Sequence, residues 1–491
     1  MTAPLLTGLG GLPTSVAAPA YDRAALRPGI VHIGPGAFFR AHTALYTDAA
    51  IGLAGGDWGI TAVSLRSADT VDALAAQNGL YTVLVRETDG TQARIVGSVL
   101  SALAASRQPE NLCALLASPQ TRIVTLTVTE KAYGLDPLTG GLDRSHPDVA
   151  ADLADPSRPR GVIGHLVEGL ARRRAAGTVP FTPLCCDNLP ANGAILKRLV
   201  LDFAAARDAG LAEWIAVNVP FPSTMVDRIT PAATEATLAD AERLTGRLDR
   251  AAVETEPFAQ WVVEDAFAAG RPEWDRAGAV FVSDVAPYEK MKLRMLNGAH
   301  SLIAYLGFLA GHEFVRDAMA DPAFAALVRA HMRAAGETLD PVPGIDLGVY
   351  ADQLAARFSN RAIAHRTYQI AMDGTQKLPQ RLVEPAAILL ERGEGAKTFA
   401  LAVAAWMRYA LGRDRDGGRY DLRDPRAEEI SARLRAVEPS GRAVSGALFA
   451  LPGLFPPALT GNTGWRGEVE HLLDLLLAGD IATAIRAVNA G

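Results

Sequence analysis

The feature that most constrains the fold is a short apolar stretch that runs directly into a glycine-rich turn and then into a helical pattern. Residues 29–33 form the apolar stretch, Gly34 and Gly36 lie in the turn, and the helical pattern continues to Ile51. A strand, a tight glycine turn and a helix in this order are typical of the first unit of a dinucleotide-binding parallel sheet. Gly34 permits the turn, and Gly36 lets a pyrophosphate approach the backbone. Phe39 occupies the place of the usual third glycine, so the turn alone is a weak indication.

A second apolar stretch, at residues 59–65, follows at the distance expected of a βαβ unit. Asp69 lies just beyond it, where a carboxylate accepts hydrogen bonds from the adenosine ribose hydroxyls and repels a 2′-phosphate. Asp69 therefore favours NAD over NADP as the cofactor, although Arg66 nearby leaves the preference open. Asp69 is also suited to cap the helix that follows it, and one side chain can serve both roles.

Strand-like and helix-like stretches alternate along the rest of the first half. Strands are expected at residues 80–86, 122–128 and 181–186, and amphipathic helices at residues 109–117 and 161–175. This alternation predicts an α/β fold with a mostly parallel, doubly wound sheet. Ligands of such sheets bind beyond the carboxyl ends of the strands, and Asn188 follows the last of these strands.

Beyond about residue 284 the sequence is dominated by long helical patterns. They cover residues 288–310, 321–335, 346–357, 383–392, 396–411 and 468–488. A chain of 491 residues is also too long for a typical single core. We therefore expect a Rossmann-type dinucleotide-binding domain over residues 1–284 and an α-helical substrate and catalytic domain over residues 285–491.

The first of these helical patterns carries Lys292, Asn297 and His300 among apolar residues. At about 100° per residue, Asn297 lies roughly 140° and His300 roughly 80° from Lys292 on the helix. Glu289 falls in the same arc, at roughly 60° from the lysine. A secondary alcohol that loses a hydride needs a base for its proton and donors for the developing alkoxide. This face offers such a set, and a solvated helix face is the alternative interpretation.

The composition excludes several classes of partner and site. A net charge of -6 at pH 7 and an isoelectric point near 5.9 give no reason to expect nucleic acid or an anionic membrane as partner. Three cysteines cannot build a disulfide framework, and no Cys/His spacing resembles a zinc site. The N-terminal segment does not resemble a signal peptide, and no apolar run approaches the roughly 20 residues of a membrane span. We therefore expect a cytoplasmic protein without a bound metal.

The spacing Lys292-x4-Asn297-x2-His300 resembles the signature of the long-chain mannitol dehydrogenase family, a zinc-independent group of oxidoreductases acting on polyols and sugar acids. Residues 34–42, 186–193 and 225–231 resemble three further blocks of this family, and the resemblance runs along almost the whole chain. It implies an enzyme that uses NAD to interconvert a secondary alcohol and a ketone on a small molecule. It also implies a monomer or a small homo-oligomer.

The same resemblance implies a role for individual residues. Lys292 matches the general acid/base, Asn188 and Asn297 match the pair that polarises the reacting oxygen, His300 matches the residue that orients it, and Glu289 matches a carboxylate that gates proton exchange. Asp227 and Lys377 match substrate-contacting positions, and Gln369 is a further expected substrate contact. The cofactor-binding positions are matched by Gly34, Gly36, Ala37, Phe38, Arg40, Arg66 and Asp69. Apolar neighbours would lower the pKa of the lysine towards neutrality and make it usable as a base.

Within the family, residues 364–381 resemble the fructuronate reductase (D-mannonate oxidoreductase) branch more than the mannitol 2-dehydrogenase branch. Gln369 stands where the mannitol enzymes resemble one another in having a substrate-binding arginine. Arg366 or Arg381 would then bind the carboxylate of a sugar acid. Residues 65–67, by contrast, resemble the mannitol branch at least as well. We predict conversion of D-fructuronate and NADH to D-mannonate and NAD, with the mannitol/fructose reaction or another polyol dehydrogenase activity as the alternative.

Two other classes are weighed against this prediction. A non-catalytic protein that senses NAD(H) needs the nucleotide turn but not the lysine, asparagines and histidine together. A sugar-phosphate dehydrogenase needs a basic cluster near the signature, where only Lys290 and Arg294 are available.

Overall fold

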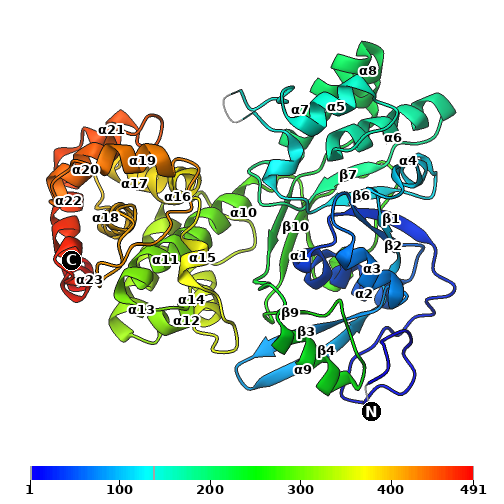
Figure 1. The fold of residues 1–491 in the computed structure, drawn as a ribbon, viewed down its shortest axis with the longest axis horizontal. Coiled ribbons are helices and arrows are strands. Elements are labelled where there is room, and N and C mark those ends of the chain that lie inside the picture. The colour runs from blue at the N-terminus through cyan, green and yellow to red at the C-terminus, as the bar shows by residue number, and fades with distance from the viewer. Residues whose placement is uncertain (1–2, 137–138, 490–491) are drawn as a thin grey trace. The chain divides into compact units, whose positions relative to one another are not determined.

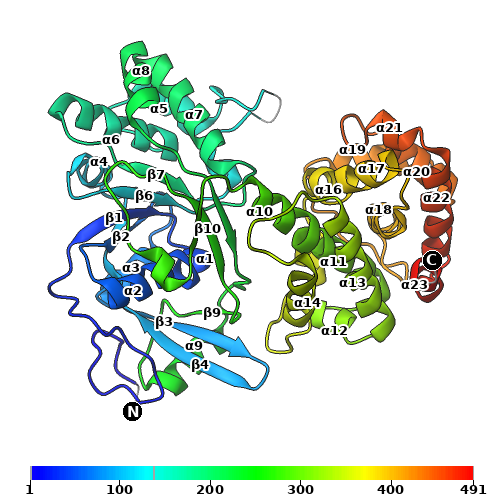
Figure 2. The same cartoon turned by 180° about the vertical axis from the view of Figure 1, so that it is seen from behind.

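The computed structural model describes residues 3–136 and 139–489. The chain divides into two compact units, Met1–Ala286 and Pro287–Gly491. The sequence analysis placed this division after residue 284. The first unit is mixed α/β and the second is helical, as Figures 1 and 2 show. Both predictions of fold class are therefore confirmed.

A five-stranded sheet forms the centre of the first unit. Its strand order is β5-β2-β1-β6-β7, and all neighbouring strands are parallel. The strands are β1 (Pro28–Ile33), β2 (Gly59–Ser64), β5 (Val99–Ala104), β6 (Ile123–Leu126) and β7 (Thr182–Cys185). This is the predicted Rossmann-type sheet, with β1 between its two halves.

Helices cover both faces of this sheet (Figure 1). The helices of the first unit are α1 (Ala37–Ala41), α2 (Thr43–Ala54), α3 (Asp69–Ala76), α4 (Pro109–Ala117), η1 (Glu130–Tyr133), α5 (Pro147–Ala154), α6 (Val162–Ala176), α7 (Asn192–Arg207), α8 (Ala209–Asn218), α9 (Glu235–Thr245) and η2 (Trp274–Ala277). Alternate residues of a strand point to opposite faces. Accordingly, Val31 and Ile33 of β1 pack in the core with α4, α6 and α7, whereas Ile30 packs in the core with α1 and α2.

One predicted strand belongs to a different sheet. The stretch at 80–86 becomes β3 (Tyr81–Glu87), which pairs antiparallel with β4 (Gly90–Val96) and parallel with β9 (Val253–Thr255). The placement of this strand in the parallel sheet was wrong because a two-residue turn, Thr88-Asp89, closes a hairpin here. A third small sheet contains β8 (Thr224–Asp227), β10 (Gln260–Glu264) and β11 (Val280–Val282).

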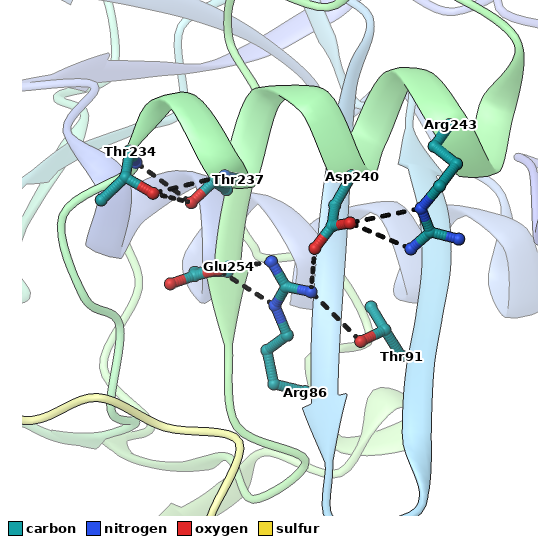
Figure 3. Close-up of polar contacts among 7 residues, drawn as sticks. All are labelled: Arg86, Thr91, Thr234, Thr237, Asp240, Arg243 and Glu254. Carbon is teal, nitrogen blue, oxygen red and sulfur yellow. Dashed lines mark hydrogen bonds and ion pairs between the residues drawn. The ribbon is translucent and has the colours of Figure 1, made fainter.

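The helix α9 is attached to this hairpin sheet by a charged network, which Figure 3 shows in close-up. Arg86 of β3 contacts Asp240 of α9 at 2.7 Å and Glu254 of β9 at 2.8 Å. Its guanidinium also donates to the Thr91 hydroxyl at 3.2 Å. One half-buried arginine therefore joins three elements that are distant in the sequence.

In the second unit the structure assigns helices and no β-strand to the described residues. The helices are α10 (Ala286–Met291), η3 (Lys292–Asn297), α11 (Gly298–Ala310), α12 (Val315–Met319), α13 (Pro322–Glu337), α14 (Leu347–Phe358), α15 (Thr367–Ile370), α16 (Gly374–Leu378), η4 (Pro379–Val383), α17 (Glu384–Glu391), α18 (Lys397–Tyr409), α19 (Ala427–Leu434), α20 (Gly441–Phe449), α21 (Pro457–Thr460), α22 (Thr463–Leu477) and α23 (Ile481–Asn489). The single helix expected over 468–488 is two helices, because the chain turns at Gly479 with φ of +81°.

The helix α18 lies at the centre of this unit. It contacts α11, α17, α20 and α22, and Figure 1 shows it nearly end-on among its neighbours. Its residues from Phe399 to Met407 are all buried. A helix that is covered on every side needs an apolar sequence all round, which explains its composition. Across the described residues, no helix is long and apolar enough to cross a membrane.

Candidate functional site

The predicted dinucleotide turn lines a cavity in the first unit. The cavity has a volume of about 330 Å³ and lies at the carboxyl ends of β1, β2 and β6. Its walls include Gly34 and Gly36 of the turn, Arg66 and Ser67 after β2, and Thr129 after β6. This is the position at which doubly wound sheets bind dinucleotides.

The two glycines of the turn are required for different physical reasons. Gly34 has φ of +93°, and a Cβ atom there would lie 2.1 Å from the carbonyl oxygen of Thr127. Gly36 is exposed, and a Cβ atom there would meet no atom nearer than the Gly34 carbonyl oxygen at 3.9 Å. The first glycine therefore permits the turn and the second leaves room beside the backbone, so these residues fit the pyrophosphate of a dinucleotide.

His32 explains why phenylalanine replaces the third glycine. The rings of His32 and Phe39 stack with their centroids 3.5 Å apart. The imidazole is within hydrogen-bond distance of the Thr125 hydroxyl at 2.8 Å and of the Gly34 carbonyl oxygen at 3.0 Å. Burial lowers the pKa of His32 to about 3, so the ring is neutral. The stacked pair supports the turn from within the core.

Other residues predicted to bind the cofactor lie around the turn rather than in the cavity wall. Arg40 is buried and donates to the carbonyl oxygens of Ala251 and, at 3.3 Å, of Gly36. Ala37 opens α1, and the ring of Phe38 stacks on His42 at 4.8 Å. Arg40 therefore holds the turn from behind.

Asp69 does not cap its helix, contrary to that expectation. The capping position of α3 is Ala68, and Asp69 is the first helical residue. Its carboxylate accepts a hydrogen bond from the Ser67 hydroxyl at 3.1 Å. The side chain of Asp69 is exposed, and its neighbours Ser67 and Thr70 line the cavity.

Asp187 is a functional residue that the sequence analysis missed. Its carboxylate accepts hydrogen bonds from the backbone of Val128 at 2.9 Å and of Thr129 at 3.2 Å, and from the Tyr133 hydroxyl at 2.7 Å. Thr129 lines the cavity with φ of +74°, a strained conformation for a β-branched residue. Asp187 thus holds the strained cavity wall, and burial raises its pKa. The sequence feature that could have identified Asp187 is its position directly before Asn188.

Asn188 and Asp227 lie at the carboxyl ends of two different strands of the first unit. Asn188 is exposed and follows β7, as expected from the sequence. Asp227 is buried and is the last residue of β8. The neighbouring Arg228 donates to the carbonyl oxygens of Ala41 at 2.6 Å and Glu256 at 2.8 Å, which fixes the end of this strand.

In the second unit, the signature segment has an unexpected conformation. Lys292–Asn297 is a π-helical segment between α10 and α11, not part of a regular α-helix. Its hydrogen bonds span five residues, which brings Asn297 closer to the side of the helix that carries Lys292. The angle of about 140° expected between them was therefore wrong, because it assumed α-helical geometry throughout. Short π-helical segments occur frequently at functional sites.

The three signature side chains are buried in the structure. The exposed fractions of Lys292, Asn297 and His300 are 7%, 6% and 7%. The Nδ2 atom of Asn297 and the Nε2 atom of His300 find no hydrogen-bond partner among the described residues. Because buried polar groups are normally paired, two such nitrogens near one lysine suit a site that binds a substrate oxygen.

His300 lies in a group of positively charged side chains. Its ring is 4.5 Å from the ring of Phe358 and 5.3 Å from that of His365. The pKa of His300 is held well below 6.5 by burial first, and then by His365, Arg357, Arg381 and Lys292. His300 is therefore neutral. Arg357 and His365 were missed, because nothing in their local sequence links them to the signature.

Arg381 reaches this group from a second π-helical segment, η4. Its Nη1 atom is 3.4 Å from the Ser301 hydroxyl. The two π-helical segments are in contact. A Cβ atom at Gly298 would lie 3.0 Å from the Arg381 carbonyl oxygen, so a larger residue there would force the segments apart. We define Lys292, Arg357, Lys377 and Arg381 as the cation group.

The other predicted substrate contacts are placed as follows. Lys377 donates to the carbonyl oxygens of Met372 at 2.6 Å and Ile370 at 3.3 Å, and it helps to lower the pKa of His365 to about 4, after burial. Arg366 is exposed and pairs with Glu313 at 3.1 Å. Gln369 is exposed on α15, and Glu289 is half-buried on α10.

Two observations bear on the alternative sites. Arg294 is buried and donates to the carbonyl oxygen of Thr338 at 2.7 Å, which removes one of the two cations considered for a phosphate. Among residues 3–136 and 139–489, no group of three or more His, Cys, Asp or Glu side chains could hold a metal ion.

Comparisons with known proteins cover both units. The models of the mannitol dehydrogenase Rossmann domain and of the mannitol dehydrogenase C-terminal domain match residues 28–276 and 284–471. The uncharacterized oxidoreductase YeiQ of Escherichia coli (strain K12) is 48% identical, covering 94% of each chain. The D-mannonate oxidoreductase of the same strain is 45% identical, covering 92% of this chain and 94% of the relative. The structure of Pseudomonas fluorescens mannitol 2-dehydrogenase with NAD and D-mannitol is 40% identical, with a TM-score of 0.87 and coverage of 99% of both chains.

These matches confirm the resemblance drawn from the signature and the three sequence blocks. They extend over nearly the full length of the chain and include a structure that holds NAD. The chain therefore belongs to the mannitol dehydrogenase family and is an NAD-dependent oxidoreductase that acts on a polyol or a sugar acid.

Proposed function

We propose that the enzyme reduces the keto group of D-fructuronate with NADH and forms D-mannonate. The observation that carries this proposal is the cation group, of which Lys292, Arg357 and Arg381 act on the neutral His300 and Lys377 acts on the neighbouring His365. A sugar acid brings a carboxylate that arginine can bind with two parallel hydrogen bonds, whereas a neutral polyol brings none. The 45% identity to a D-mannonate oxidoreductase supports the same substrate class.

In this proposal each signature residue has one chemical task. NADH supplies the hydride. Lys292 donates the proton that completes the new hydroxyl group, and Glu289 exchanges that proton with solvent. The amides of Asn188 and Asn297 donate hydrogen bonds to the carbonyl oxygen as negative charge develops on it. His300, being neutral, orients the same oxygen.

Arg381 is the residue we propose for the substrate carboxylate, because it belongs to the cation group. Arg366, the other sequence candidate, is 64% exposed and already pairs with Glu313. The two arginines therefore provide a matched pair of variants. Arg381→Gln should lower kcat/KM for fructuronate by about a hundredfold and for fructose much less, because only the acid loses its partner. Arg366→Gln should behave like the wild type.

The deciding measurement is kcat/KM for fructuronate and fructose with NADH, and for mannonate and mannitol with NAD. We expect the value for fructuronate to exceed that for fructose by about a hundredfold or more, since only the acid offers a carboxylate to the guanidinium of Arg381. If fructose and mannitol are the better pair, the sugar-acid proposal is wrong and the enzyme is a mannitol 2-dehydrogenase with the same signature residues.

A further inference from the structure

We propose that Asp148 sets the preference of this enzyme for NAD(H) over NADP(H) by holding the side chain of Arg66. Arg66 follows β2, at the position from which side chains reach the adenosine ribose in this type of sheet. Its Nη2 atom forms an ion pair with the Oδ2 atom of Asp148 at 2.8 Å. Asp148 comes from the first turn of α5, which is far from Arg66 in the sequence.

The position of Arg66 between two cavities gives this ion pair its significance. Leu65 and Arg66 line both the dinucleotide cavity and a second cavity of about 420 Å³. Asp148 lines only the second cavity. The ion pair therefore draws the guanidinium towards the second cavity, although Arg66 also borders the first.

Without this contact, Arg66 would be well suited to bind a 2′-phosphate. Its side chain is 76% exposed, and arginine binds phosphate through paired, charge-assisted hydrogen bonds. Asp148 opposes such binding in two ways, because its carboxylate engages the guanidinium and also repels the phosphate. Asp69 adds a second carboxylate three residues after Arg66, with Ser67 as its hydrogen-bond donor.

A neighbouring ion pair provides a control for charge alone. Asp72 of α3 contacts Arg107 through two hydrogen bonds, at 2.9 Å and 3.0 Å, and both side chains are exposed. Neither residue lines the two cavities. Asp72→Asn therefore removes one negative charge near the site without releasing Arg66.

The test is isothermal titration of the folded protein with 2′,5′-ADP, which carries the 2′-phosphate, and with 5′-AMP, which lacks it. Asp148→Asn should bind 2′,5′-ADP about tenfold more tightly than the wild type, the usual effect of one charge-assisted hydrogen bond, and should bind 5′-AMP unchanged. Asp72→Asn should show neither change. Adding Arg66→Gln to Asp148→Asn should abolish the gain.

The same variants should shift the ratio of kcat/KM for NADPH and NADH in the same direction. The proposal is wrong if Asp148→Asn leaves 2′,5′-ADP binding unchanged, if Asp72→Asn produces an equal gain, or if the gain persists without Arg66. Because these titrations use nucleotides alone, their outcome is independent of which sugar or sugar acid the enzyme reduces.

Discussion

At the scale of single residues, Lys292, Asn297 and His300 combine burial with nitrogen atoms suited to contact a substrate oxygen. The π-helical segment makes this combination possible, since it displaces Asn297 from its α-helical position. A second lysine, Lys290, lies two residues before Lys292 and offers a comparison. Lys290 is exposed, whereas Lys292 is buried.

Replacing Lys292 by alanine should lower turnover by about 10²–10⁴, the usual contribution of a general acid or base. The affinity for NADH should stay close to that of the wild type, because the lysine acts on the substrate oxygen. Steady-state kinetics and fluorescence titration with NADH measure the two quantities. Lys290→Ala is the control and should retain full activity. A Lys292→Ala enzyme that keeps more than about a tenth of the wild-type rate would show that the lysine is structural.

At the scale of elements, the attachment of α9 to the hairpin sheet depends on few groups. Arg86 bridges Asp240 and Glu254 from a half-buried position, whereas Arg243 contacts the same Asp240 from an exposed one (Figure 3). Truncating the inner arginine leaves two carboxylates close together without their shared cation. Truncating the exposed Arg243 leaves the bridge from Arg86 to Asp240 and Glu254 intact.

Arg86→Ala should therefore loosen α9 from the sheet, whereas Arg243→Ala should have little effect, because exposed ion pairs contribute little to stability. Amide hydrogen exchange of α9, followed by mass spectrometry, should become about tenfold faster in the first variant, consistent with a loss of about 1.4 kcal/mol. Equal exchange rates in the two variants would contradict the bridging role of Arg86.

Much of this organisation follows from local patterns in the sequence. The parallel strands and most helices were predictable because β1 is a short apolar run before a glycine turn and the buried residues of α4 recur with the period of a helix. The π-helical segment was not, since the periodicity of apolar residues does not reveal a slip in the hydrogen bonds. Arg357 was missed for a different reason: packing alone brings it near His300, from a separate helix.

At the scale of the whole molecule, five histidines with lowered pKa values make stability depend on pH. Burial lowers the pKa of His32 and His331 to about 3 and of His165 and His365 to about 4, and that of His300 falls well below 6.5. In the unfolded chain these groups titrate near pH 6.5. Below that pH the unfolded state binds more protons than the folded state, so stability is complete above about pH 6.5 and falls as the pH decreases.

We expect the urea midpoint of the second unit, which holds three of these histidines, to decrease between pH 7 and pH 5. Each histidine contributes up to about 1.4 kcal/mol per pH unit. His331→Leu should make the decrease shallower, because the variant lacks one histidine that binds a proton in the unfolded state but not in the folded state. His471→Leu changes an exposed histidine and should leave the slope unaltered. The expectation fails if the midpoint is constant, or if both variants flatten it equally.

The central position of α18 has a consequence for synthesis on the ribosome. The strands of the first unit are all complete by Val282, so that unit can fold while later residues are still being added. In the second unit, α18 is covered by α22, which begins more than fifty residues later. The nascent chain must therefore hold an exposed, apolar α18 until α22 has left the exit tunnel. During this interval we expect chaperones that bind apolar segments to engage the nascent chain.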